Sequence, residues 1–112
     1  MADEDQTTAL KYVLDYAKQA YGEGAPVTIR LMHRYGYSLY KDGEYREAIN
    51  VLKETLERST NLYGETGGEA FEINMNLGYA YSQRRERWEP RLKYFDRALE
   101  ILRERGEQET IT

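Results

Sequence analysis

The stretch GYSLYKDGEYREAI, residues 36–49, decides the fold of this chain. It places aromatic and apolar residues at helical spacing on both sides of Asp42-Gly43, a dipeptide typical of a tight turn. One helix that ends before this turn and another that begins after it predict an antiparallel helix pair. The fold class that follows is all-α.

A repeat with a period of 42 residues extends this prediction to most of the chain. The letters YGE at 21–23 recur at 63–65, and YGY at 35–37 has its counterpart in LGY at 77–79. Both matches share one offset, and the apolar positions between them agree. Self-similarity at a fixed period is typical of repeat architectures, so we expect the helix pair to occur twice.

Apolar stripes at i, i+4 and i+8 run through successive segments, and no segment alternates with period two for long enough to suggest a strand. We expect one domain over residues 6–105: a lone helix, then the repeats 26–62 and 69–105. The flanking residues 1–5 and 106–112 are expected to form disordered tails. The predicted helices lie near 6–21, 26–41, 44–62, 69–84 and 90–105.

Gly36 and Gly78 stand in the middle of predicted helices, one repeat apart. A mid-helix glycine costs about 1 kcal/mol relative to alanine, so it needs a compensating reason. The close approach of a neighbouring helix is the usual one. We therefore expect both glycines to contact the partner helix of their pair.

These residues resemble the tetratricopeptide repeat. That family has a small residue midway through its first helix, a short turn, and then an aromatic residue and an alanine in the second helix, as at Gly36, Tyr45 and Ala48. The second copy retains Gly78, Phe95 and Ala98, but it has Trp88 where the first has Tyr45 and Arg91 where the first has Ala48. The 42-residue period is similar to the subgroup that includes kinesin light chains and related bacterial arrays. The resemblance implies an α-solenoid that binds a protein or peptide and is not an enzyme.

The resemblance also implies where a ligand lies, because the first helix of each pair lines the concave groove in such arrays. Tyrosine and arginine are the residue types most common in binding hot spots. Packing between helices is the alternative role for the aromatic residues. The groove positions carried onto this chain are Arg30, His33, Arg34, Tyr37 and Tyr40 from one helix, and Glu72, Met75, Asn76, Tyr79 and Ser82 from the other.

The two end helices carry apolar residues beyond one face. Tyr12, Val13 and Tyr16 lie outside the inner stripe of 6–21, and Tyr94 and Ile101 outside that of 90–105. Solenoid units bury their cores against neighbours, so these positions predict self-association. The alternative function is thus a structural segment of a longer solenoid, with a homo-oligomer as one outcome.

Composition narrows the classes of partner and chemistry. The net charge is −4 and there is no cysteine, which makes a nucleic-acid partner or a thiolate metal site poor expectations. His33 is the only histidine, and no motif for catalysis, a cofactor or a metal emerges. The acidic start and the short apolar runs predict neither a secretory leader nor membrane insertion. Cytoplasmic and periplasmic locations both stay open.

Overall fold

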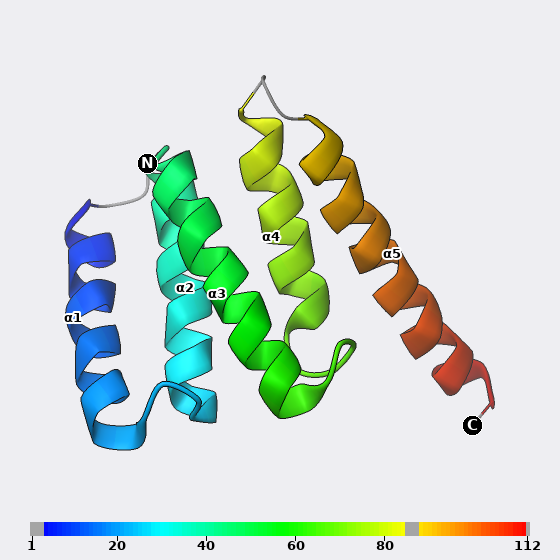
Figure 1. Ribbon diagram of the computed structural model, residues 1–112, viewed down its shortest axis with the longest axis horizontal. Helices are drawn as coiled ribbons and strands as arrows, with labels where there is room; N and C mark the ends of the chain where they lie inside the picture. Colours follow the sequence, from blue (N-terminus) through cyan, green and yellow to red (C-terminus); the bar gives the residue numbers. More distant parts are fainter. Residues whose placement is uncertain (1–3, 85–87, 112) are drawn as a thin grey trace.

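The computed structural model describes residues 4–84 and 88–111, and the side chains of residues 6–84 and 90–106. All regular structure in these ranges is helical, and each helix packs against the next one in an antiparallel row (Figure 1). The expected all-α repeat of helix pairs is confirmed. The helices are α1 (Glu4–Tyr21), α2 (Pro26–Lys41), α3 (Tyr45–Tyr63), α4 (Ala70–Ser82) and α5 (Trp88–Ile111).

Local sequence explains the helix ends. Pro26 begins α2, where its missing N–H leaves no intrahelical bond unmade. After α2 the chain turns through Gly43, whose φ of 84° favours glycine, and the Glu44 N–H closes the turn on the Leu39 carbonyl at 2.9 Å. Gly64, also at φ 84°, ends α3. The turn at Gly43 reverses the chain and brings the two helices of the first pair together.

The core has two parts joined by α3. One cluster lies between α1, α2 and α3, and the other between α3, α4 and α5. Ala48 faces the first and the next residue, Ile49, faces the second. The first cluster holds Leu14, Met32, Tyr35, Leu39 and Ala48; the second holds Ile49, Leu52, Ile73, Leu77, Ala80 and Tyr94.

The two mid-helix glycines mark close helix crossings, as expected. A Cβ atom on Gly36 would lie 2.8 Å from Cγ and Cδ2 of Leu52, and a Cβ on Gly78 would overlap the ring of Phe95. Both contacts join the first helix of a pair to the second helix of the same pair. The absence of a side chain at each glycine therefore sets how closely the paired helices approach.

The predicted tails need a correction, because α1 begins at Glu4 and α5 continues to Ile111. The tail residues 1–3 and 112 lie outside the described residues. At the C-terminal end, Arg105 donates hydrogen bonds to the carbonyls of Thr66 and Gly68, each at 3.0 Å. This contact with the α3–α4 loop supports α5 at the point where the prediction ended the helix.

The face that α5 turns inward was predicted correctly at Phe95 and Ala98 and wrongly at other positions. Tyr94 and Ile101, expected at an open surface, are 8% and 0% exposed. By contrast, Leu92, Leu99 and Leu102 are 41%, 44% and 52% exposed. Both sets recur at helical spacing, so periodicity alone could not choose between them.

Aromatic packing accounts for the face that α5 uses. The ring of Tyr94 stacks on Tyr81 of α4, with centroids 5.7 Å apart and the planes 8° from parallel. Burial, then the neighbouring Tyr81, raises the pKa of Tyr94, so its phenol stays neutral. The side of α5 that holds Tyr94 thus packs inward, and its leucine stripe is left at the surface.

Candidate functional site

A hollow of roughly 370 Å³ lies between α2 and α4, the first helices of the two pairs. These helices touch each other directly although they are not consecutive in the chain. The hollow is lined by His33, Arg34 and Tyr37 of α2, by Glu72 and Asn76 of α4, and by Glu69, which precedes α4.

Five of the ten predicted groove residues therefore meet in this hollow. Of the others, Ser82 donates its hydroxyl hydrogen to the Tyr79 carbonyl at 2.6 Å, so this group turns back to its own helix. Met75 is half-buried and does not line the hollow. Tyr40 and Tyr79 belong to an adjoining row of aromatic rings, and Arg30 borders a second hollow.

His33 is held at both ring nitrogens. Its Nδ1 lies 2.6 Å from Oε1 of Glu69, and its Nε2 lies 2.8 Å from Nδ2 of Asn76. The histidine side chain is only 12% exposed, whereas that of Glu69 is 42% exposed. The chain of contacts therefore links α2 to the start and the middle of α4.

Glu69 is the residue that sequence reasoning missed. It lies one position before α4 and 36 residues after His33, so no local pattern connects the two. A carboxylate is favoured near a helix N-terminus, which was the one available signal. That signal does not point to a histidine on another helix.

A row of aromatic rings continues the hollow toward the C-terminal ends of α2 and α4. The ring centroids of Tyr37 and Tyr40 are 6.1 Å apart, those of Tyr40 and Tyr79 are 6.4 Å apart, and those of Tyr79 and Phe95 are 5.5 Å apart. Tyr37 and Tyr79 are 42% and 41% exposed. The row therefore offers partly exposed ring surface beside the hollow.

The phenol of Tyr40 is neutral in this row. Burial raises its pKa, and the neighbouring Tyr45, Tyr37 and Tyr79 raise it further. Lys41 Nζ lies 5.4 Å from the centroid of the Tyr37 ring, a cation–π distance. The aromatic row thus has the Lys41 ammonium at its edge, and its Tyr40 phenol is uncharged.

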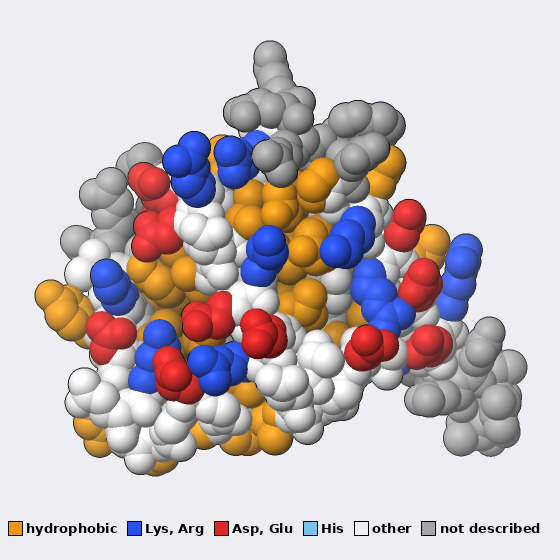
Figure 2. Space-filling view, viewed as in Figure 1, with side chains coloured by type: hydrophobic (Ala, Val, Ile, Leu, Met, Phe, Trp, Pro, Cys, Tyr) orange, Lys and Arg blue, Asp and Glu red, His pale blue; other side chains and the backbone are white. Residues whose placement is uncertain are grey.

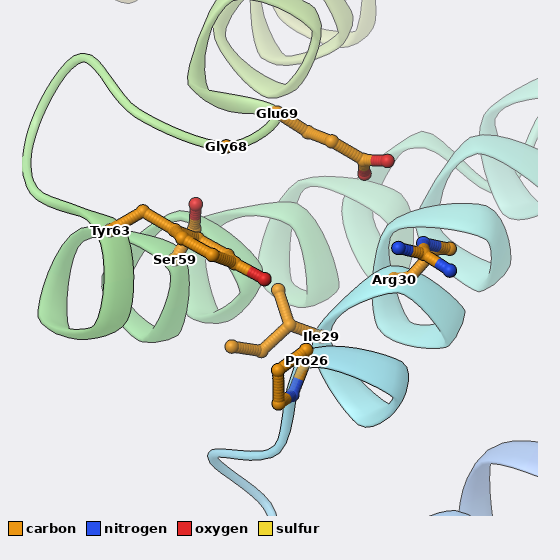
Figure 3. A pocket seen from close by; sticks show the side chains of 7 residues that line it. All are labelled: Pro26, Ile29, Arg30, Ser59, Tyr63, Gly68 and Glu69. Carbon is orange, nitrogen blue, oxygen red and sulfur yellow. The ribbon is translucent and has the colours of Figure 1, made fainter.

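The second hollow, of about 160 Å³, lies at the N-terminal end of α2 (Figure 3). Pro26 and Ile29 form one side, and Tyr63 and Gly68 lie on the other. Ser59 also borders it, and its buried Oγ has no hydrogen-bond partner within the described part of the chain. Arg30 and Glu69 also border it, so Glu69 lies at the boundary of both hollows.

The charge of α2 is unlike that of the whole chain. Between Pro26 and Lys41 it carries Arg30, Arg34 and Lys41 and no carboxylate, while the chain has a net charge of −4. Arg30 and Arg34 are exposed, and neither forms an ion pair with another described residue. On the face shown in Figure 2, by contrast, acidic and basic side chains are intermixed. The helix that forms one side of the hollow is therefore basic.

No group of three or more histidine, cysteine or acidic side chains that could hold a metal ion occurs among the described residues. In the same residues, no helix is both long enough and apolar enough to cross a membrane. The hollow, with the side chains of Arg34, Tyr37 and Asn76, has the groups for ion pairing, ring contact and hydrogen bonding.

A comparison with protein families identifies the first helix pair. A family model described as tetratricopeptide repeat matches residues 28–66, which include most of α2 and all of α3. Residues 28–66 are therefore a tetratricopeptide repeat. The second helix pair has the same glycine contact as the matched repeat. No curated protein matches the chain.

The family gives the general role of the chain. Tetratricopeptide repeats stack into solenoids whose surfaces bind other proteins, and the family is generally non-catalytic. The likeness to the kinesin light chain subgroup stays a prediction. The groove residues are likewise a hypothesis about where a partner binds.

Proposed function

We propose that the hollow between α2 and α4 binds an extended segment of a partner protein and receives a carboxylate of that segment on α2. The observation that carries this proposal is the pair of exposed cations Arg30 and Arg34, one helical turn apart and without ion pairs among the described residues. Arginine suits the role because its guanidinium can donate two parallel hydrogen bonds to a carboxylate.

The opposite wall restricts the charge of the partner. Glu72 lines the hollow from α4, and Glu69 lies just before that helix. A uniformly acidic segment would meet repulsion there, whereas a segment with acidic groups toward α2 and neutral or basic groups toward α4 would not. The charge distribution therefore favours a segment of mixed charge.

The aromatic row supplies contact area. Tyr37 and Tyr79 expose part of their rings next to the hollow, and such rings lose little conformational entropy on binding. An apolar or aromatic side chain of the segment would pack on them while its carboxylate pairs with an arginine. Binding hot spots usually combine a large apolar contact area with directed polar contacts.

A phage-displayed peptide library selected on the purified chain tests this proposal. We expect enriched peptides to combine an acidic residue with an apolar or aromatic residue. The double variant Arg34→Ala with Tyr37→Ala should bind them more weakly by about 2 kcal/mol or more, as measured by calorimetry. Binding should also weaken with salt, because the arginines are exposed.

The matched control changes the second helix of the same pair. Lys53 and Glu57 are exposed on α3 and do not line the hollow, so Lys53→Ala with Glu57→Ala should leave the affinity unchanged. Circular dichroism should report equal helicity for both double variants. Selected peptides that bind the Arg34 and Tyr37 variant as tightly as the parent would locate the binding site elsewhere.

A second candidate function, self-association, is favoured by the leucine stripe on α5. Leu92 and Leu99 lie 43 residues after Ile49 and Leu56, which is one residue more than the repeat period. Phe95 lies at the same distance after Leu52, and these two residues meet the mid-helix glycines. Ile49 and Leu56 pack into the cluster shared with α4. Their counterparts on α5 have the spacing that suits a further helix, and a second copy could supply it.

Sedimentation over a wide concentration range tests this candidate. We expect a dimer or larger species, and a monomer for the variant Leu99→Glu with Leu102→Lys. The corresponding change on α1, Val13→Glu with Tyr16→Lys, tests the other end, where these side chains are 49% and 66% exposed. A parent protein that is monomeric at high micromolar concentration excludes association through either end.

A further inference from the structure

The side-chain amide of Asn76 has one orientation that its neighbours allow. A carboxylate accepts hydrogen bonds and donates none, so the 2.6 Å contact of Glu69 with His33 requires the hydrogen on Nδ1 of the ring. In the neutral ring, Nε2 then carries a lone pair and accepts a hydrogen bond. Glu69 therefore determines which ring nitrogen faces Asn76 as an acceptor.

Asn76 must therefore donate a hydrogen bond from its NH2 group to Nε2 of His33. The Nδ2–Nε2 distance is 2.8 Å, and the reversed amide would set the Oδ1 lone pairs against the lone pair of Nε2. Nδ2 is bound to the ring, and the contacts of Asn76 with the described residues include no hydrogen bond to Oδ1. Asn76 lines the 370 Å³ hollow, so this acceptor belongs to the binding groove.

We propose that Glu69 and His33 act as positioning residues that hold the Asn76 carbonyl oxygen as a fixed hydrogen-bond acceptor for an N–H group of the bound segment. This inference rests on the proposed function, since it concerns the same hollow. A segment that excludes water from Oδ1 must return a hydrogen bond, or it leaves a polar atom unpaired. A backbone N–H satisfies the acceptor, and a carbonyl or carboxylate at this position is rejected.

The two walls of the hollow then recognise opposite groups. Arg34 on α2 offers only donors and takes a carboxylate, whereas Asn76 on α4 offers an acceptor and takes an N–H. The hollow therefore recognises the backbone of the segment as well as its charge. These contacts determine the orientation of the segment across the groove. In the reversed orientation, an N–H of the segment would face the donors of Arg34 and its carboxylate would face the acceptor of Asn76.

Nitrogen NMR of the free protein tests the amide orientation without any ligand. At mildly alkaline pH, where an imidazole is neutral, we expect His33 as the Nδ1–H tautomer. We also expect one Asn76 amide hydrogen bonded to Nε2. In Glu69→Gln the side-chain NH2 can donate to Nδ1, so a shift toward the Nε2–H tautomer is expected. An Nε2–H tautomer in the parent overturns the proposal.

Backbone ester substitution tests the role in binding. The probe is a peptide selected on the parent chain, made as a series in which one backbone N–H at a time is replaced by an ester oxygen. We expect one ester peptide to bind the parent about tenfold more weakly than the unmodified peptide does. The same ester should cause no loss of affinity for the variants Asn76→Leu and Glu69→Gln. Glu72→Gln, in the same hollow but without a contact to His33, should keep the full loss.

The outcomes separate the two proposals. An ester series in which the parent and Asn76→Leu show the same losses overturns the role of Oδ1 and leaves groove binding intact. A peptide that binds equally to the parent and to the Arg34 and Tyr37 double variant overturns groove binding, whatever the tautomer. Equal melting temperatures of Glu69→Gln and Glu72→Gln exclude a general loss of fold as the cause.

Discussion

Gly36 of α2 packs directly against the side chain of Leu52 on α3, with 2.8 Å between the position of a Cβ and the Cγ and Cδ2 atoms of the leucine. Leu52 is fully buried, so it has little room to withdraw. This crossing and its counterpart at Gly78 set the spacing within each helix pair. The hollow lies between α2 and α4, the first helices of these two pairs.

The first prediction concerns this crossing. Gly36→Ala should lower the free energy of unfolding by about 1–3 kcal/mol, because overpacking at the contact exceeds the gain in helix propensity. Urea denaturation measures the change. A variant as stable as the parent would mean that Leu52 can move and that the glycine is not needed for close approach.

Gly106 provides the control for that substitution. It lies in α5, and a Cβ at this position meets no atom of the described residues within 4 Å. Gly106→Ala should therefore stabilise the protein by up to about 1 kcal/mol through helix propensity alone. If the free energy of unfolding falls in Gly36→Ala and rises in Gly106→Ala, the effect of packing is separated from that of helix propensity.

The second prediction concerns a buried hydroxyl. Ser59 is 1% exposed and its Oγ has no hydrogen-bond partner among the described residues, while Ala17 is its counterpart one repeat earlier. Ser59→Ala should raise the free energy of unfolding by about 1 kcal/mol, since an unpaired buried polar group is removed. Thermal and urea unfolding of the variant give the value.

Ser38 is the matched control, because it is also buried in a helix but its hydroxyl is hydrogen-bonded to Thr7. Ser38→Ala should destabilise the protein by about 1 kcal/mol, as the Thr7 hydroxyl loses one of its partners. If Ser59→Ala destabilises as much as Ser38→Ala, the Ser59 hydroxyl has a partner in solution.

The pattern of glycines, aromatic residues and turns was sufficient to predict the helices and their pairing, because each signal is local. The face of α5 was not predictable in this way. Leu92 and Tyr94 belong to two stripes with the same helical period, and the choice between them depends on the ring of Tyr81 in another helix. Periodicity identifies a helix and does not identify the neighbour of each face.

The lining of the hollow between α2 and α4 was predictable only in part, for a similar reason. Resemblance to the repeat family located His33, Arg34 and Asn76 on the inward helices. The contact between His33 and Glu69 joins a helix to a loop 36 residues away, and only the folded chain brings them together. Tertiary contacts of this kind carry no signal in a single sequence.

The third prediction concerns alkaline pH. Burial, then the carboxylate of Glu47, raises the pKa of Tyr35 above its ordinary value of 10.0, and burial also raises those of Tyr40 and Tyr94. Near pH 10 the unfolded chain therefore releases protons that the folded chain retains. The contribution of these tyrosines to stability is complete below pH 10 and is lost as the pH rises above it.

Urea denaturation at several pH values measures this loss. Tyr94→Phe should flatten the decline above pH 10 by up to about 1.4 kcal/mol per pH unit, the value for one proton. Tyr12→Phe is the control, because this ring is 73% exposed. Equal slopes for the two variants would indicate that Tyr94 ionises as readily in the folded protein as in the unfolded chain.

The most direct test of the central claim is a chemical-shift map of the labelled protein titrated with a selected peptide. Binding in the groove predicts the largest changes at Arg34, Tyr37, Asn76 and Tyr79, on the facing sides of α2 and α4. It also predicts small changes at Tyr12 and Leu99 on the end helices. Changes confined to α1 or α5, with the α2 and α4 signals unmoved, would contradict the groove as the binding site.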